Sequence, residues 1–213
     1  MDFNDSQQEA AFRKEARDFL EANAEKRSII SDKPNDKNPQ IAVAGAPETV
    51  KGGKEAAQEA LERAKVWQKK KAEAGFAAIL WPKEFGGYGG SPIQQVIYSQ
   101  EEHDYLVPSG YFEIGIGMLG PTMMVWGKDE DKKRYLPKMI TGEEIWCQLF
   151  SEPSAGSDLA GIKMKAEKDG DEWVLNGQKV WTSGAHFADY GMIVARSDPS
   201  ALKHKGLTYF YLD

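Results

Sequence analysis

Two segments of this chain combine residue types that could hold a polar ring or an anion. Residues 146–158 read Trp-Cys-Gln-Leu-Phe-Ser-Glu-Pro-Ser-Ala-Gly-Ser-Asp, a hydroxyl-rich loop that contains glycine. Such loops expose backbone N–H groups and serine oxygens to an anion or to the polar edge of a ring. Residues 176–184 read Asn-Gly-Gln-Lys-Val-Trp-Thr-Ser-Gly and place an indole beside two hydroxyls. Alone, each segment is more often structural than functional, but the two in this order are the most specific feature of the sequence.

A third pattern, Gly115-Ile-Gly-Met-Leu-Gly120, fits the G-x-G-x-x-G motif of dinucleotide-binding proteins. That function requires a strand before the motif and a helix opening at it, within a βαβ unit. Helical patterns lie on both sides of this motif, and Pro121 follows it at once. We therefore interpret it as a place where small residues allow close helix packing.

Two groups of carboxylates could perform acid–base chemistry. Glu152 and Asp158 lie in the first segment, where we expect them to fix the loop by hydrogen bonding rather than to act as acid and base. In Glu101-Glu102-His103-Asp104, adjacent residues cannot share one helical face. We interpret that run as a solvated helix end.

Metal and nucleophilic chemistry receive little support. His103, His186 and His204 lie far apart, and Cys147 is the single cysteine, so no zinc-type spacing exists and no metal is expected. A Ser-His-Asp hydrolase stays open by residue order alone, but the nucleophile-elbow motif is absent.

Composition bounds the remaining classes. The chain has 213 residues and a net charge of −6, which argues against nucleic acid as the partner. Hydrophobic residues make up 41%, enough for a core in one large or two small domains. One cysteine suits a reducing compartment. The acidic, polar N-terminus is unlike a signal peptide, and no apolar run could cross a bilayer, so we expect a cytoplasmic protein without a membrane span.

The first part of the chain is predicted to be helical. Ser6 and Glu9 fit a capping box ahead of residues with helical spacing. Gly75 is placed to end a helix over 55–74, and Pro92 to begin the next. Residues 31–53, rich in proline and glycine, predict a long loop, and residues 81–90 a shaped turn. Helices are expected over about 7–20, 55–74, 92–105, 114–126 and from 129 onward.

The second part is predicted to be β-structure. Residues 162–168 alternate, residues 169–171 turn the chain, and Asn176-Gly177 is a strong hairpin signal between 173–175 and 178–181. Residues 190–196 and 206–212 read as further strands. The expected fold class is α+β. An all-α domain over 1–142 precedes an antiparallel, barrel-like domain over 143–213, which about five strands leave incomplete. We expect the chain to be the N-terminal portion of a longer protein.

These motifs and their order resemble the acyl-CoA dehydrogenase family over nearly the whole chain. Residues 81–87 match its Pro-x-x-Phe/Tyr-Gly-Gly turn, and 120–122 and 134–137 match its later helices. Residues 152–158 match its cofactor loop, and 181–184 its flavin-ring segment. Two features depart from the commonest pattern, namely the long loop at 31–53 and Gln148 in place of an aromatic residue. Both occur in a bacterial branch, where some members act on bulky or unusual acyl-CoAs and some form mixed oligomers.

The resemblance implies an FAD-dependent oxidoreductase of fatty acid or other lipid metabolism that introduces an α,β double bond into an acyl-CoA thioester. Residues 148–151 and Ser183 would bond the flavin ring edges, with Ser183 near N5. Trp181 would pack on the ring face away from substrate. Gly156 and Ser157 would approach the pyrophosphate, and Ser157 would also meet the acyl-CoA. The implied cofactor-binding set is Gln148, Leu149, Phe150, Ser151, Gly156, Ser157, Trp181, Thr182 and Ser183.

The resemblance does not assign a catalytic base within this chain and leaves alternative functions open. The family's catalytic base is usually a carboxylate of a C-terminal helical domain, no residue here matches it, and we expect the 213-residue portion alone to be inactive. An electron-transfer flavoprotein is the implied acceptor, and the full-length protein is expected to be a homotetramer or mixed tetramer. An acyl-CoA oxidase of the same fold, or a catalytically silent relative that binds acyl-CoA or a partner subunit, remains an alternative.

Overall fold

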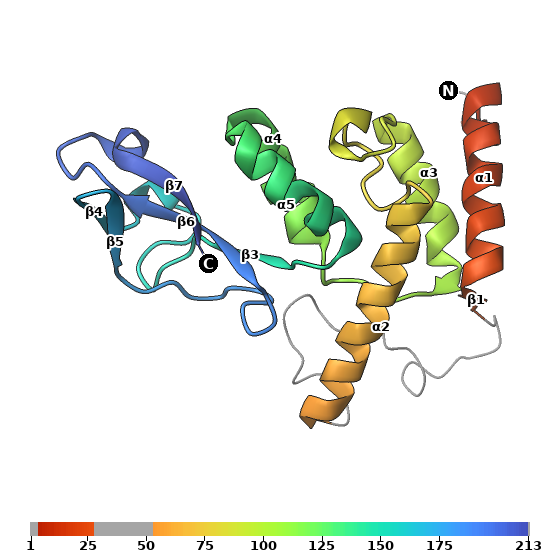
Figure 1. Cartoon of the computed structure of the whole chain (residues 1–213), viewed down its shortest axis with the longest axis horizontal. Helices are drawn as coiled ribbons and strands as arrows, with labels where there is room; N and C mark the ends of the chain where they lie inside the picture. The colour runs from red at the N-terminus through yellow and green to blue at the C-terminus, as the bar shows by residue number, and fades with distance from the viewer. Residues whose placement is uncertain (1–3, 28–52, 213) are drawn as a thin grey trace. The chain divides into compact units, whose positions relative to one another are not determined.

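The computed structural model describes residues 4–27 and 53–212 (Figure 1). The chain divides into two compact units, Met1–Glu143 and Glu144–Asp213, one residue after the expected domain boundary. The first is helical and the second holds a partial sheet, so the expected α+β fold class is confirmed. The loop expected at 31–53 lies outside the described residues except for Gly53.

Local sequence signals set the helix ends in the first unit. Ser6 caps α1 (Gln7–Asn23) through the expected capping box with Glu9. Ser91 caps α3 (Pro92–His103) in the same way, with Pro92 at the first turn. Helix α2 (Gly53–Glu73) is terminated by Gly75, two residues past its last residue. The φ of 84° at Gly75 lets the Phe76 N–H donate back to the Lys71 carbonyl at 2.8 Å. Two short strands, β1 (Glu25–Lys26) and β2 (Tyr105–Leu106), pair antiparallel.

Helices α1 and α3 pack side by side around Phe12, Ala16 and Ile97, all nearly fully buried. At the end of this interface the Glu101 carboxylate accepts from Arg13 at 3.0 Å and from Arg17 at 2.9 Å. Glu101 is buried, so the expectation of a solvated end over 101–104 is wrong at this position. The partners of Glu101 lie on the neighbouring helix α1, and the spacing of residues along α3 does not reveal them.

The glycine motif at 115–120 forms a π-helical turn, Gly115–Leu119, that runs into α4 (Gly120–Trp126). A Cβ on Gly120 would lie 2.0 Å from Cζ2 of Trp81, so the indole packs directly on the helix backbone. The same indole donates to the Ile116 carbonyl at 2.9 Å. The strand before the motif, β2, has two residues, ends at Leu106 and pairs antiparallel with β1, so it forms no βαβ unit with the motif. The interpretation of the motif as close packing through small residues is confirmed at Gly120. Helix α5 (Asp129–Thr141) follows, with three acidic residues in its first turn.

The second unit contains a five-stranded sheet of β3 (Trp146–Leu149), β4 (Lys165–Asp169), β5 (Glu172–Asn176), β6 (Tyr190–Arg196) and β7 (Leu207–Leu212). Strand β6 pairs antiparallel with β7 and parallel with β3, and it meets β4 in parallel at one residue pair. The described strands do not close into a barrel. The sheet is mixed, so the expectation of a purely antiparallel domain is wrong, because β3 and β6 are joined by a long excursion rather than by a turn.

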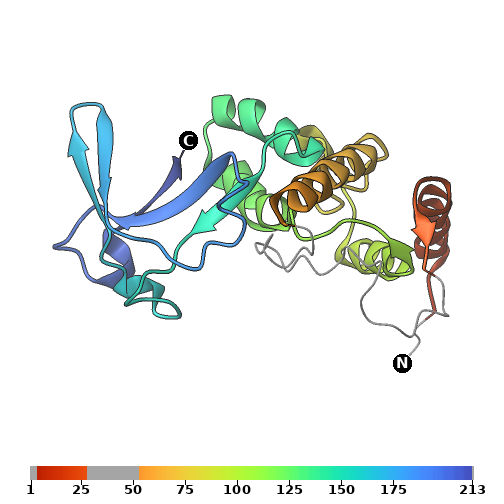
Figure 2. The same cartoon turned by 90° about the horizontal axis from the view of Figure 1, so that it is seen from below.

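The hairpin of this unit lies one turn earlier than the Asn176-Gly177 signal predicts. Strands β4 and β5 pair antiparallel on either side of the expected turn at 169–171 and form the light-blue hairpin of Figure 2. Gly170 in this turn has a φ of 61°. Gly177 has a φ of 157°, and residues 178–181, expected as the second strand, form none, so the Asn-Gly hairpin prediction is wrong. A Cβ on Gly177 would lie 2.7 Å from Cγ of Met164. Glycine at this position therefore allows the chain to pass close to Met164, the residue before β4, and does not form a two-residue turn.

Candidate functional site

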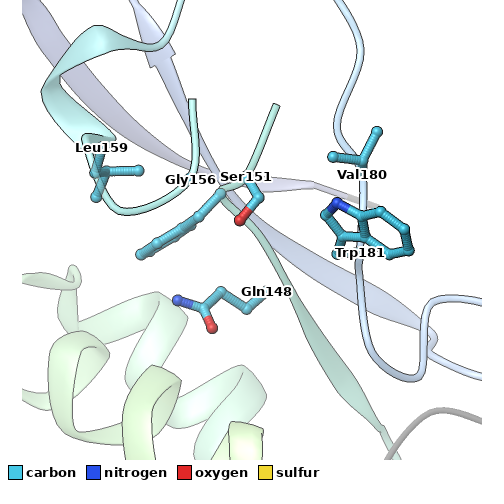
Figure 3. Close-up of a pocket in the computed structure, with 7 residues that line it drawn as sticks. Gln148, Ser151, Gly156, Leu159, Val180 and Trp181 are labelled. Carbon is cyan, nitrogen blue, oxygen red and sulfur yellow. The ribbon is translucent and has the colours of Figure 1, made fainter. Parts of the chain in front are cut away.

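A hollow of about 200 Å³ lies in the sheet unit, and both segments singled out in the sequence contribute to it (Figure 3). Leu159 lies on one side and Val180 and Trp181 on the other, with Gln148 and Ser151 between them in this view. The walls come from β3, the loop that follows it, and the irregular segment after β5. The lining residues are Gln148, Phe150, Ser151, Gly156, Leu159, Val180 and Trp181.

Strand β3 aims alternate residues at the hollow and at the core. Gln148 lines the hollow, whereas Leu149 packs against the buried cluster that contains Ile193 and Ala195. Leu149 also fills the space beside Gly191, since a Cβ added to Gly191 would lie 2.3 Å from Cδ1 of Leu149. The alternation follows from the two-residue period of a strand, so any contact of Leu149 with a ligand here would be through its backbone.

The loop after β3 is held by its own backbone. The Glu152 N–H donates to the Ala155 carbonyl at 2.8 Å, and the Ala155 N–H donates back to the Glu152 carbonyl at 3.1 Å. Gly156 follows directly, and a Cβ on it would meet no atom within 4 Å. The loop therefore presents an open backbone surface at Gly156. The neighbouring Ser157 side chain is exposed and outside the lining.

The Glu152 carboxylate lies beneath this loop and is buried. It accepts from the N–H groups of Lys163 at 2.7 Å and Met164 at 3.0 Å, and from the Lys179 ammonium at 2.9 Å. Burial raises the pKa of Glu152, but these donors outweigh that effect and leave the pKa below its ordinary value. The expectation that Glu152 fixes the loop by hydrogen bonding is confirmed.

The second segment crosses the first beside the hollow. The Val180 N–H donates to the Ser151 carbonyl at 2.9 Å. The next residue, Trp181, has a φ of 58°, a left-handed conformation that is uncommon for a bulky residue. Its side chain is 91% exposed, so Trp181 is not a core aromatic. A strained backbone that holds a large apolar side chain in solvent is typical of functional sites.

The remaining residues of the predicted site lie just beyond the lining. Thr182 and Ser183 belong to the turn over 182–188, in which Gly184 has a φ of 77°. Ser183 is exposed and Thr182 half-buried. The hollow thus brings together Gln148, Phe150, Ser151, Gly156 and Trp181 of the predicted set, and not the side chains of Leu149, Ser157, Thr182 and Ser183.

Sequence reasoning missed three residues of this site. Leu159 and Val180 add apolar wall, and Lys179 ties the two segments together from below. Lys179 was detectable in principle, since Val180 and Trp181 follow it directly and a lysine beside apolar residues can bury its aliphatic stem. Its partner could not be inferred, because the pairing with Glu152 joins residues 27 apart in the sequence.

Two further classes of site were sought. Across residues 4–27 and 53–212, no group of histidine, cysteine, aspartate and glutamate is arranged to hold a metal ion. In the same described ranges, none of the helices combines the length and apolarity that crossing a membrane requires.

Comparison with known proteins decides the family. The model of the acyl-CoA dehydrogenase N-terminal domain matches residues 6–143, and that of the middle domain matches residues 147–213. This chain belongs to the acyl-CoA dehydrogenase family. The prediction from its motifs is confirmed, and the family's two domain models meet where the helical unit ends and β3 begins.

Individual relatives agree. The acyl-CoA dehydrogenase IpdE1 of Mycobacterium tuberculosis is 40% identical over 158 residues, which cover 74% of this chain and 41% of the relative. Among solved structures, the Tcur3481-Tcur3483 steroid ACAD is 32% identical with a TM-score of 0.74, over 100% of this chain and 49% of that chain. The ChsE4-ChsE5 complex from M. tuberculosis is 29% identical with a TM-score of 0.69, over 99% and 48%. The match therefore covers less than half the length of each of these relatives.

Proposed function

We propose that this chain supplies the flavin-binding part of an acyl-CoA dehydrogenase, which introduces an α,β double bond into an acyl-CoA thioester. One observation carries the proposal. Trp181 is held in a left-handed conformation with its indole in solvent, at the rim of a hollow that polar groups of the family's cofactor loop also line. A planar, partly polar ligand would cover the indole and use the polar groups.

The residues present fit FAD. The Gln148 amide both donates and accepts hydrogen bonds, and the Ser151 hydroxyl does the same, which suits a ring edge that alternates nitrogen and carbonyl groups. Trp181 offers an aromatic face. The open space beside Gly156 admits a phosphate close to backbone N–H groups. FAD would supply hydride acceptance, the redox step that protein side chains cannot perform.

The family resemblance assigns finer roles within this proposal. Gln148, Ser151 and Ser183 would bond the flavin edge together with the backbone of Leu149 and Phe150. Gly156 and Ser157 would approach the pyrophosphate, with Ser157 also reaching the acyl-CoA. Trp181 and Thr182 would border the ring.

The chain's residues orient substrate and cofactor but do not supply the base. Removal of a proton next to a thioester carbonyl needs a base in contact with that carbon. The seven residues that line the hollow carry no carboxylate or imidazole. Glu152 is buried in an ion pair with a lowered pKa, which suits a fixed anion rather than a proton acceptor. We therefore assign the base to a part of the full-length protein beyond the residues described.

Substrate and partners follow the relatives in this proposal. One similar structure is titled a steroid ACAD, so we propose an acyl-CoA with a bulky acyl group as substrate. That title and the ChsE4-ChsE5 complex each name two proteins, which supports a mixed oligomer over a homotetramer. We further propose a cytoplasmic protein that passes electrons to an electron-transfer flavoprotein.

The visible spectrum of the full-length protein tests cofactor binding. We expect a yellow protein with bound, non-covalent FAD, released on denaturation in about one equivalent per chain. A colourless protein that takes up no FAD on reconstitution would contradict the proposal. During turnover, stoichiometric oxygen consumption would indicate an oxidase rather than a dehydrogenase.

A further inference from the structure

A buried ion pair joins two residues that are next in the chain to residues lining the hollow but do not line it themselves. The side chains of Lys179 and Glu152 are 3% and 5% exposed, and their charged atoms are 2.9 Å apart. The Lys179 ammonium also donates to the carbonyl of Phe150 at 3.0 Å. Phe150 and Val180, the neighbour of Lys179 in the chain, both line the hollow and belong to two different wall segments. The ammonium therefore connects the two walls.

The carboxylate extends this connection to a third segment. Besides the ammonium, Glu152 accepts from the N–H groups of Lys163 and Met164, which lead into β4. One buried anion thus ties the loop after β3, the approach to β4, and the segment that carries Val180. The Val180 N–H bonds the Ser151 carbonyl at 2.9 Å, adjacent to the pair.

Stability alone is a weak reason for such a pair. Taking two charges out of water offsets much of their attraction, so well-packed apolar residues often stabilise a fold equally well. Apolar residues would not supply donors and acceptors directed at chosen backbone groups. Apart from the ion pair itself, the contacts all hold backbone groups, and one of these, the Phe150 carbonyl, belongs to a residue that lines the hollow. Fixed backbone at the lining is the property that a preorganised binding site requires.

We propose that Lys179 and Glu152 are positioning residues that set the spacing between the Phe150–Ser151 wall and the Val180–Trp181 wall, and thereby the fit of the flavin ring. Neither side chain touches the ligand in this account. The flavin part of the inference rests on the proposed function. The spacing itself is a property of the flavin-free chain and can be measured separately.

Three variants of the full-length protein test the proposal: Glu152→Gln, Lys179→Met, and the double variant. Each single variant leaves a buried charge unpaired and should lower Tm. Each should also weaken FAD binding by about tenfold or more, the loss expected when a charge-assisted bond that orders the site is removed. The absorption bands of the bound flavin should shift, and hydrogen exchange at the Val180 N–H should quicken.

The double variant separates positioning from stability. Removing both charges relieves the unpaired charge, so Tm should recover toward that of the wild type. FAD affinity, the flavin bands and Val180 exchange should stay altered, because the walls remain untied. A double variant with wild-type affinity, bands and exchange would overturn the proposal. If the double variant does not fold, Lys179→Arg replaces it, because this variant keeps the charge but changes its reach. Altered FAD affinity, flavin bands and Val180 exchange would then support the proposal, and wild-type values of all three would overturn it.

Glu101→Gln provides the matched control, since Glu101 is a buried carboxylate paired with Arg13 and Arg17 in the helical unit. It should lower Tm and leave FAD affinity and the flavin bands unchanged. Equal loss of FAD binding in this control would overturn the proposal. A wild-type protein that binds no FAD would defeat the proposed function alone. Faster Val180 exchange in the double variant than in the wild type would then still support the positioning role, and equal exchange would refute it.

Discussion

At the residue scale, the site depends on side chains whose placement opposes their ordinary preferences. Trp181 exposes 91% of its surface and has a φ of 58°, and neither property helps the chain to fold. Glu152 and Lys179 are charged and buried. Such departures are expected where function rather than stability selects the residue. They lead to two predictions.

Replacing Trp181 should separate folding from cofactor binding. Trp181→Gly relieves the left-handed backbone, and little buried surface is lost, so the free energy of unfolding without flavin should change by less than about 1 kcal/mol. FAD affinity should fall by roughly tenfold, as expected for loss of an aromatic contact. Chemical denaturation and flavin titration measure the two effects. Trp181→Phe should keep most of the affinity, and a Trp181→Gly variant with wild-type affinity would remove Trp181 from the site.

The buried carboxylates predict how stability depends on pH. Bonds from Arg17 and Arg13 outweigh burial and lower the pKa of Glu101, and the Glu152 pKa is lowered as described above. A depressed folded-state pKa adds stability that is complete above the ordinary value of 4.5 and is lost as pH falls from there through the folded-state value. Unfolding free energy measured between neutral pH and pH 3 should therefore decline more steeply in the wild type than in Glu101→Gln or Glu152→Gln. Equal slopes would contradict this.

At the scale of elements, the sequence predicted those helix ends that are set by contacts between residues close together in the chain. Ser6 caps α1 and Gly75 ends α2 as expected, because the groups involved lie within a few residues of each other. The Asn176-Gly177 hairpin failed, because a type I′ turn needs positive φ at both residues and only Gly177 has one. Contact with Met164, distant in sequence, decides that conformation. The parallel pairing of β3 with β6 escaped prediction for the same reason.

The glycine motif yields a prediction at this scale. Gly120→Ala would place a methyl group within the ring of Trp81 and should destabilise the protein by about 1–3 kcal/mol, as overpacking does. Gly117→Ala meets no atom within 4 Å and should be neutral or slightly stabilising. Thermal unfolding of both variants checks this. A severe loss of stability or of cofactor binding in Gly117→Ala would contradict the packing interpretation.

At the scale of the whole molecule, the family motifs predicted that two separate segments form one site, which periodicity and turn signals alone did not. The cofactor loop and the flavin-ring segment lie about 20 residues apart in sequence, yet Val180 bonds Ser151 and both line one hollow. Their meeting follows from the fold of the sheet unit, which periodicity alone did not predict. The proposed function assigns the base to a part of the protein outside the described residues, and the matches cover less than half the length of these relatives.

Anaerobic mixing of the FAD-loaded, full-length protein with acyl-CoA thioesters of linear and bulky acyl groups tests the central claim most directly. The account predicts bleaching of the flavin absorbance by at least one thioester, with a product lighter by two hydrogens that carries an α,β double bond. Bulky acyl groups should react fastest. A protein that binds both FAD and acyl-CoA but shows neither bleaching nor an unsaturated product would contradict the account and would identify a catalytically silent member of the family.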